Sequence, residues 1–439
     1  MSFTINKFSL KRIALITSLM VLWVTSLPSV SRAIPIDIAP TSASSPKGAG
    51  LNQGLKALAR GDDKDAEAAF QAALKDDPKR FEALLGLAEI ALRRNTPDMA
   101  REYIEKARAV APKQVDVETA WGRWHVSKKQ YSDATAIFQQ AMELERSAIA
   151  PRLDLADLYL SALRKPQLAA ELYRQVIKIA PTHAGAHYAL GIAMVDIGSP
   201  EIAKKEWREA SHLAPSNPFP SYALGNLYLM EKQYDAALSE FELALKADKS
   251  FAKAHLGRGD AWLAKGDDRE AIAEYEAALT IQPQLAIAHE KIGMLHHQRK
   301  HWAEAERAYL AAIEINQKSP LAYNNLAWVK LEQNIDQDTA VRRARQAVDL
   351  VPQSSQFQDT LGWAYRAAGD KAKASTTLAR AAAINPPNPE ILYHLGVVLA
   401  EAGRNRDAMT AFRKALDLKA GFPGADDARS RLAKLEQIR

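Results

Sequence analysis

The sequence has no cysteine among its 439 residues, and it has no concentrated stretch of basic charge. The first absence excludes disulfide bonds, thiolate metal sites, a cysteine nucleophile and lipidation through an N-terminal cysteine. The net charge of +6 arises largely from the first 33 residues, which carry Lys7, Lys11, Arg12 and Arg32 but no acidic residue. The remaining chain has 54 basic and 52 acidic side chains. Because nucleic-acid binding usually requires a basic stripe, this balance argues against a nucleic-acid partner.

Long apolar runs are equally scarce, and one alone stands out, over residues 13–27. Basic residues precede it, Pro28 ends it, and Ser31-Arg32-Ala33 places small residues where a signal peptidase reads. This layout predicts a signal peptide over residues 1–33 with cleavage after Ala33, and hence a periplasmic or secreted protein. The run has 15 residues, fewer than the roughly 20 that span a bilayer, so retention as an inner-membrane anchor is the alternative. Residues 34–46, rich in proline and small polar residues, are expected to form a flexible linker.

What the sequence does have is a period. Alanine recurs eleven times at steps of 34 or 35 residues, which predicts a stack of similar supersecondary units. These alanines are Ala66, Ala100, Ala134, Ala169, Ala203, Ala237, Ala271, Ala305, Ala340, Ala374 and Ala408.

Two further series share this period and suggest how each unit packs. A small residue precedes most of these alanines by 12 positions, as at Gly122 and Gly191, with Asp157 as an exception. A usually large residue follows each alanine by four positions, as at Phe138 and Trp207. Small residues allow helices to approach closely, and a bulky one fills the space beside them.

Each unit is expected to hold two helices, called helix A and helix B. Apolar residues recur at three- and four-residue steps, and the pattern breaks in the middle of the unit. Glycine often lies at that break, as at Gly61, Gly198 and Gly266, where a left-handed C-cap conformation costs little. The two 35-residue steps place one extra residue between Ala141 and Asp157 and another around Gln333–Gln337.

The pattern resembles the tetratricopeptide repeat, a 34-residue helix-turn-helix with small residues at its eighth, twentieth and twenty-seventh positions. Residues 184–217 and 252–285 follow it nearly throughout. The resemblance covers residues 47–422 and implies an all-α, right-handed superhelical solenoid of eleven repeats. Residues 423–439 carry one apolar stripe and are expected to form a capping helix.

No catalytic or cofactor motif emerges from the chain. The densest group of candidate ligands is His289, His296, His297 and His301, but the repeat frame points them in different directions. A metal site needs three or four convergent ligands, so packing is the favoured interpretation. We expect no enzyme activity, no cofactor and no metal.

The resemblance instead implies a binding groove, since positions 2, 5, 9, 12 and 13 of helix A usually face a ligand in this family. Aromatic and amide side chains at these positions suit extended peptides or carbohydrate chains. The resemblance gives the following groove residues: Tyr188, Phe219, Tyr222, Asn226, Met230, Asp260, Met294, His297, Asn324, Trp328, Trp363 and Tyr393.

Segments 322–328, 359–370 and 388–404 also look like parts of exported bacterial repeat proteins of exopolysaccharide and PEP-CTERM systems. That resemblance implies a non-catalytic scaffold whose partners are proteins, either an extended peptide or a subunit of an envelope complex. The alternative is a solenoid that guides a polysaccharide along its groove. A membrane would be a partner only if the N-terminal segment stays uncleaved.

Overall fold

The structure, a computed structural model, describes residues 49–437, which form helices and no strands. The signal peptide and linker predicted for residues 1–46 lie outside this range. The chain divides into two compact parts. The first holds the described residues up to Met230 together with Lys246–Asp248, and the second holds Glu231–Leu245 and everything from Lys249 onward. Across the described residues, no helix combines the length and the apolar character that crossing a membrane requires.

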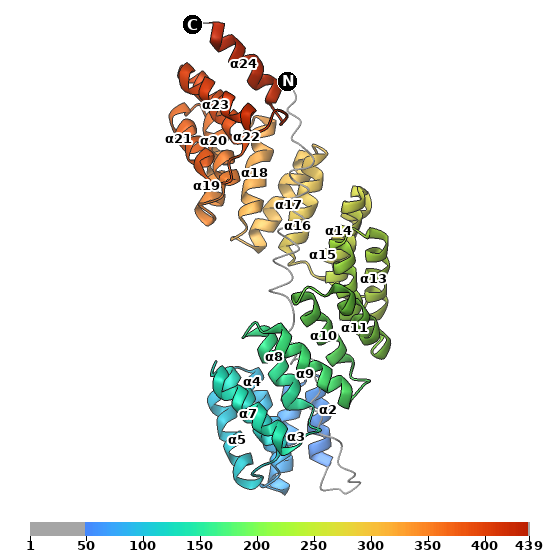
Figure 1. The fold of residues 1–439 in the computed structure, drawn as a ribbon. Helices are drawn as coiled ribbons and strands as arrows, with labels where there is room; N and C mark the ends of the chain where they lie inside the picture. Colours follow the sequence, from blue (N-terminus) through green and yellow to red (C-terminus); the bar gives the residue numbers. More distant parts are fainter. Residues whose placement is uncertain (1–48, 438–439) are drawn as a thin grey trace. The chain divides into compact units, whose positions relative to one another are not determined.

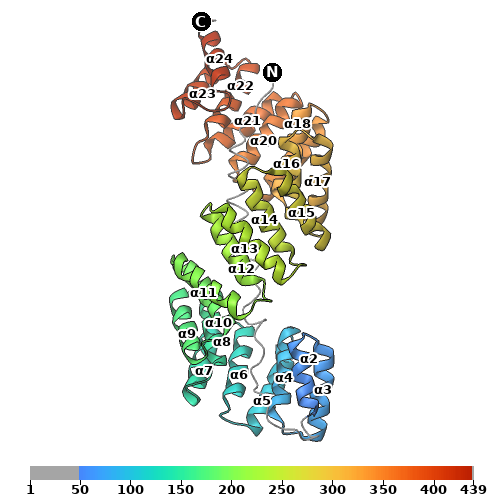
Figure 2. The same cartoon turned by 90° about the vertical axis from the view of Figure 1, so that its right-hand side faces the viewer.

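The N-terminal part contains five helix pairs and the first helix of a sixth (Figures 1 and 2). Even-numbered helices are helix A of each repeat and odd-numbered ones are helix B. The bounds are α2 (Ala49–Ala59), α3 (Asp63–Asp76), α4 (Phe81–Arg93), α5 (Pro97–Val110), α6 (Val115–Ser127), α7 (Tyr131–Leu144), α8 (Ala150–Ser161), α9 (Pro166–Ile179), α10 (Ala184–Asp196), α11 (Pro200–Leu213) and α12 (Phe219–Met230).

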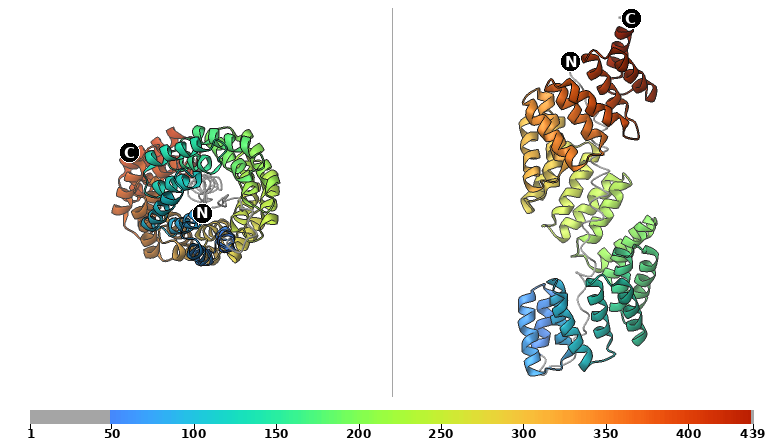
Figure 3. Two further views of the ribbon diagram at one scale, coloured as in Figure 1. Left: turned by 90° about the horizontal axis from the view of Figure 1, so that it is seen from below. Right: turned by 90° about the vertical axis from the view of Figure 1, so that its left-hand side faces the viewer.

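The C-terminal part continues the same alternation, and its helix pairs stack as successive layers in the right-hand view of Figure 3. Its bounds are α13 (Tyr234–Ala247), α14 (Ala252–Lys265), α15 (Asp268–Ile281), α16 (Ala286–Gln298), α17 (Trp302–Ile315), α18 (Pro320–Gln333), α19 (Gln337–Leu350), α20 (Ser355–Ala367), α21 (Lys371–Ala383), α22 (Pro389–Glu401), α23 (Asn405–Leu418) and α24 (Ala425–Gln437). The last helix, α24, packs Ala428, Leu432 and Leu435 onto the cluster formed by α22 and α23. The predicted fold class, an all-α solenoid of helical repeats, is confirmed.

Close approach between helices explains the alternation of small and bulky residues. Phe70 is fully buried between Gly54 on its own repeat and Gly86 on the next. A Cβ atom at Gly54 would lie 2.5 Å from Phe70 Cε1, and one at Gly86 would lie 2.4 Å from Phe70 Cε2. These distances are far below van der Waals contact, so only glycine fits at either position while the ring stays in place.

The turns between helix A and helix B also follow the predicted chemistry. Gly61, Gly198 and Gly266 adopt φ values of +79°, +82° and +93°, which glycine reaches without a Cβ clash. The extra residue predicted around Gln333–Gln337 falls in such a turn, where Asn334 and Asp336 both have positive φ. The Asp336 side chain then caps α19 by accepting a hydrogen bond from the Thr339 backbone N–H (3.2 Å).

Asp157 is an acidic residue where the other repeats have a small one. Its Oδ1 accepts a hydrogen bond of 2.6 Å from the Tyr173 hydroxyl, so a polar pair replaces the usual contact between a small residue and an aromatic ring. Burial raises the pKa of Asp157 from 3.8 to about 7, although the hydrogen bond from Tyr173 opposes the shift. This carboxyl group therefore titrates in the neutral range.

Asp157→Asn is expected to stabilise the protein at pH 8 and to change little at pH 4. Because the pKa of Asp157 is higher in the folded than in the unfolded state, the contribution of this residue to stability is fully present below pH 4. It is lost as the pH rises through 7. Asparagine removes this dependence and still accepts the hydrogen bond from Tyr173. Converting the whole pKa shift at 1.36 kcal/mol per pKa unit would give a larger gain. Because the side chain is only partly enclosed, we expect a gain of about 1–2 kcal/mol.

Urea unfolding followed by circular dichroism between pH 4 and pH 8 measures this gain. Asp133→Asn, at an exposed carboxylate in the first turn of α7, is the control and should show no comparable pH-dependent gain. A gain for Asp157→Asn that is the same at pH 4 and pH 8 would contradict a raised pKa for Asp157.

A candidate partner-binding groove

The inner layer of each part is built from helix A of successive repeats. In the N-terminal part α4 contacts α6 and α6 contacts α8, and in the C-terminal part α18 contacts α20 and α20 contacts α22. Helix B of each repeat packs against this layer through its small residues, which are fully buried at Ala100, Ala134 and Ala169. Side chains on the opposite face of helix A consequently remain available to a partner.

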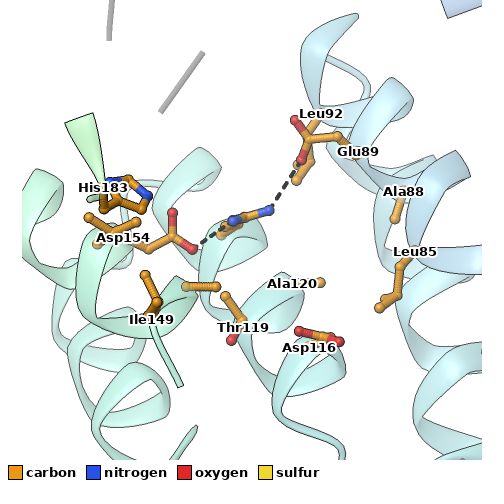
Figure 4. Close-up of a pocket in the computed structure, with 13 residues that line it drawn as sticks. Leu85, Ala88, Glu89, Leu92, Asp116, Thr119, Ala120, Ile149, Asp154 and His183 are labelled. Atoms are coloured by element: carbon orange, nitrogen blue, oxygen red, sulfur yellow. Dashed lines mark hydrogen bonds and ion pairs between the residues drawn. The ribbon is translucent and has the colours of Figure 1, made fainter. Parts of the chain in front are cut away.

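A pocket of about 260 Å³ lies on that face in the N-terminal part (Figure 4). Helices α4, α6 and α8 supply most of its walls, and Ile149 and His183, just before α8 and α10, complete it. Leu85 and Leu153 give it apolar sides. An apolar pocket with a few converging polar groups is the usual form of a binding site.

The polar centre of the pocket is the Arg123 guanidinium, which lies between two carboxylates. Its Nε donates to Asp154 Oδ2 at 2.7 Å, and its Nη1 lies 3.7 Å from Glu89 Oε2. Asp154 is almost entirely buried, with 7% of its side chain exposed. Burial raises the pKa of Asp154, and Arg123 opposes that shift. Burial alone would lower the pKa of Arg123, but Asp154 and Glu89 outweigh it and raise the value.

The groove residues predicted from the sequence include none of the residues that line this pocket. Glu89, Thr119, Arg123 and Asp154 occupy positions 9, 5, 9 and 5 of their repeats, which are among the groove positions that the family resemblance implies. They were missed because the choice favoured aromatic and amide side chains in later repeats. The positional rule alone, applied to the second, third and fourth repeats, would have found them.

Five predicted groove residues lie in the N-terminal part. Tyr188, Phe219 and Tyr222 form a partly exposed aromatic group. The rings of Tyr188 and Phe219 lie with their centroids 6.4 Å apart. Burial, with a contribution from Tyr222, raises the pKa of Tyr188. Asn226 is half-buried and Met230, at the end of α12, is 51% exposed.

Four predicted residues of the C-terminal part are buried. Asp260 Oδ1 accepts a hydrogen bond from the Tyr275 hydroxyl (2.7 Å) and lies 2.7 Å from Lys291 Nζ. Met294, His297 and Asn324 are 4%, 8% and 1% exposed. Their side chains support the packing of neighbouring helices and offer little surface to a ligand.

The predicted tryptophans are partly exposed but engaged by their neighbours. Trp328 Nε1 donates to Thr360 Oγ1 at 2.8 Å. The Trp363 ring lies 4.3 Å from the His394 ring, centroid to centroid, and the Arg366 guanidinium carbon lies 4.5 Å from the Trp363 centroid. A ligand that stacks on Trp363 would therefore compete with these contacts.

Tyr393, the last predicted groove residue, belongs to the docking of the final helix. It is 2% exposed, and its hydroxyl donates to Asp427 Oδ2 of α24 at 2.8 Å. Its ring lies beside Phe422, with centroids 6.1 Å apart. The capping segment thus covers this end of the predicted groove.

The histidine group does not assemble into a metal centre. His296 and His301 approach to 3.5 Å between their Nδ1 atoms, while His297 is buried beside Trp302 and Tyr309. Across residues 49–437, no three potential ligands of the histidine, cysteine, aspartate or glutamate type converge on one point.

Comparison with known proteins identifies the repeats. The model of a family described as "Tetratricopeptide repeat" matches residues 51–114, 188–250, 222–286 and 359–426. No curated protein was found that matches the chain. Similar solved structures include the APC/C hetero-tetramer Cut9-Hcn1 (14% identity, TM-score 0.46) and yeast Tom70 (13% identity, TM-score 0.41), each covering 89% of this chain and 96% of its own. A tetratricopeptide repeat protein from Parabacteroides merdae is similar at 19% identity and TM-score 0.43, over 57% of this chain and 98% of its own.

Proposed function

The chain belongs to the tetratricopeptide repeat family, and from that premise we propose that it is a non-catalytic scaffold whose helix A surfaces hold a protein partner. Repeat arrays of this family serve as protein-interaction scaffolds, since stacked units expose long binding surfaces instead of an enclosed active site. The observation that carries the proposal is the pocket between α4, α6 and α8, which opens at the ligand-facing positions of three consecutive repeats. A segment of extended peptide that runs across successive helices A would meet it directly.

We further propose that the scaffold works outside the cytoplasm, in the assembly or export of exopolysaccharide or another envelope complex. The support is the sequence of residues 1–33, with its basic start, its apolar run and its small residues up to Ala33. The likeness of segments 322–328, 359–370 and 388–404 to exported repeat proteins adds to it. Fractionation of cells that produce the full chain, with N-terminal sequencing of the mature protein, tests both the location and the cleavage site.

The competing function is the guiding of a polysaccharide by groove aromatics. Sugar rings stack on open aromatic faces, and the contacts of Trp363 with His394 and Arg366 leave it less open than that function requires. Titration of intrinsic tryptophan fluorescence with oligosaccharides separates the two functions. A saturable response that disappears in Trp328→Ala and Trp363→Ala would favour the polysaccharide.

In-cell photo-crosslinking is expected to capture the protein partner from helix A positions and not from helix B. A photoreactive phenylalanine analogue at Leu92, in the pocket, or at Tyr222, in the aromatic group, should yield a crosslinked partner identifiable by mass spectrometry. The same analogue at Met99 or Ile202, which are 50% and 42% exposed on helix B, provides the matched control. Crosslinks formed equally well from the helix B positions would argue against the groove as the binding surface.

A further inference from the structure

The charged groups of the pocket between α4, α6 and α8 interact with one another. Arg123 Nε donates to Asp154 Oδ2 at 2.7 Å, and Asp116 also interacts electrostatically with Arg123. Glu89 Oε1 accepts a hydrogen bond of 3.2 Å from Arg93 Nε beside the pocket, and its Oε2 lies 3.7 Å from Arg123 Nη1. Because these charges already have partners within the chain, they give a charged ligand little advantage over an apolar one.

The surface that the pocket offers to a ligand is largely aliphatic. Leu85, Leu92, Ile149 and Leu153 line it together with three alanines (Figure 4). Leu92 and Ile149 are half-buried, so an apolar ligand would cover the part of them that is still open to water. The volume of about 260 Å³ is below the roughly 300–1,000 Å³ of sites for drug-sized molecules. It suits one or two aliphatic side chains presented by an extended backbone.

A row of leucines leads from the start of the array to this pocket. Leu51, Leu55 and Leu58 occupy positions 5, 9 and 12 of the first repeat, and the pocket residues Leu85 and Leu92 occupy positions 5 and 12 of the second. Leu55 is half-buried. In the tenth repeat, by contrast, these three positions hold aspartate, tryptophan and arginine. An apolar segment that starts at the first repeat would therefore meet apolar side chains on its way to the pocket.

The chain carries a segment of matching chemistry shortly before α2. Residues 34–40 have the sequence Ile-Pro-Ile-Asp-Ile-Ala-Pro, with isoleucine at every second position. A residue that precedes proline favours an extended backbone, in which alternate side chains point to the same side. Ile34, Ile36 and Ile38 would then present one aliphatic edge. Residues 41–48 contain no apolar side chain larger than alanine or proline, so residues 34–40 are the part that suits the pocket.

The residues between this segment and α2 are long enough to reach the pocket. Helix α4 contacts both α2 and α6, and packed helix axes lie roughly 8–10 Å apart, which places α6 about 20 Å from α2. Residues 39–48 span up to about 33 Å when extended. The pocket also lies toward the N-terminal ends of the helices A, since Ile149 and His183 directly precede α8 and α10. The chain enters α2 at the same end.

We infer that residues 34–40 of the same chain dock in this pocket, with their isoleucines against Leu85, Leu92 and Leu153. The segment follows the predicted cleavage site and so stays in the chain with or without cleavage. The inference goes beyond the proposed scaffold function and rests on it for one consequence. A partner held at this pocket must displace the segment, and must bring an aliphatic side chain of its own to do so.

Photo-crosslinking within the purified full-length chain tests the docking. The photoreactive phenylalanine analogue at Leu92 should form an internal crosslink to residues 34–40, which mass spectrometry of the digested protein locates. The double variant Ile36→Asp/Ile38→Asp should lower the yield of this crosslink at least about fivefold, because a carboxylate among the leucines loses its hydration.

Ser42→Asp/Ser44→Asp is the matched control, since it adds the same two charges nearby in the chain at polar positions. This variant should give the internal crosslink in unchanged yield. The analogue at Met99, which is 50% exposed on helix B, should give no crosslink to residues 34–40.

A fluorescent peptide of residues 34–45 provides a second measurement. It should bind at least about fivefold more tightly to Ile36→Asp/Ile38→Asp than to the unchanged chain, because the chain's own segment competes at a high effective concentration. Fluorescence anisotropy measures both affinities.

The inference would be overturned if Leu92 formed no crosslink to residues 34–40, if the isoleucine variant gave the same yield, or if both proteins bound the peptide equally well. If crosslinking in cells still captured a protein partner from Leu92 in that case, the scaffold function would stand and only the internal occupant would be wrong. An internal crosslink without any captured partner would have the opposite meaning, with the docking supported and the pocket rejected as the partner site.

Discussion

Replacing Gly191 by alanine is expected to destabilise the fifth repeat by about 2–3 kcal/mol, because the added methyl group has no space. Its Cβ would lie 2.3 Å from Trp207 Nε1 and 2.5 Å from Trp207 Cδ1. Trp207 cannot move aside easily, since it is fully buried and its Nε1 donates to the Tyr188 carbonyl at 3.0 Å. Intrinsic helix propensity alone would predict the opposite, a gain of up to about 1 kcal/mol for alanine over glycine.

Gly185 in the same helix, α10, provides the matched control for this prediction. A Cβ there would approach only the His183 ring, at 3.2 Å from Cε1, and this side chain can shift slightly. Gly185→Ala should therefore leave stability within about 1 kcal/mol of the unchanged protein. Repeat arrays need not unfold in one step. For this reason the test measures both the urea midpoint of the whole chain and the hydrogen-exchange rates of α10 and α11. Equal exchange rates in the two variants would show that Trp207 accommodates the methyl group.

The helical stack could be predicted because each repeat is subject to the same local constraint. A bulky residue such as Phe138 must fit beside Gly122, and equivalent positions recur at steps of 34 or 35 residues. Periodicity therefore revealed the packing positions, and even the two insertions, without any knowledge of the fold. Asp157 departed from the pattern in composition but kept its geometry, because its carboxylate accepts a hydrogen bond from the Tyr173 hydroxyl.

The groove was harder to predict because exposure depends on neighbours that lie one repeat away. His297 and Asn324 occupy expected ligand-facing positions, yet adjacent helices bury both. Trp328 is held by Thr360, which lies 32 residues later in the sequence. A repeat pattern specifies the direction of each Cβ atom, but the sizes of the surrounding side chains decide what reaches the surface.

The pocket was still harder to predict than the groove, because it is formed by contacts between repeats. Arg123 and Asp154 are 31 residues apart, and neither belongs to a motif that local sequence reasoning detects. Only the stacking of α6 on α8 brings a guanidinium and a carboxylate within 2.7 Å. The ion pair is consequently a property of two neighbouring repeats and not of the repeat itself.

Arg123→Ala is expected to destabilise the N-terminal part by about 2–3 kcal/mol at pH 7.5, somewhat less than for a fully enclosed pair because Arg123 is 28% exposed. The substitution leaves Asp154 buried without its partner. Burial already raises the pKa of Asp154 above 3.8, and loss of Arg123 removes the main opposing influence. A raised folded-state pKa means that stability is retained at low pH and lost as the pH rises. The deficit should thus be largest at pH 7.5 and should shrink toward pH 4.

Two further variants separate this electrostatic cause from a simple loss of packing. Asp154→Asn added to Arg123→Ala removes the unpaired charge, so the double variant should regain at least half of the lost stability at pH 7.5. Arg404→Ala breaks an exposed pair with Asp407 and should cost less than about 1 kcal/mol. Urea unfolding at pH 4.5 and pH 7.5 distinguishes the explanations. A deficit in Arg123→Ala that is independent of pH, and that Asp154→Asn does not relieve, would mean that the aliphatic stem of Arg123 matters rather than its charge.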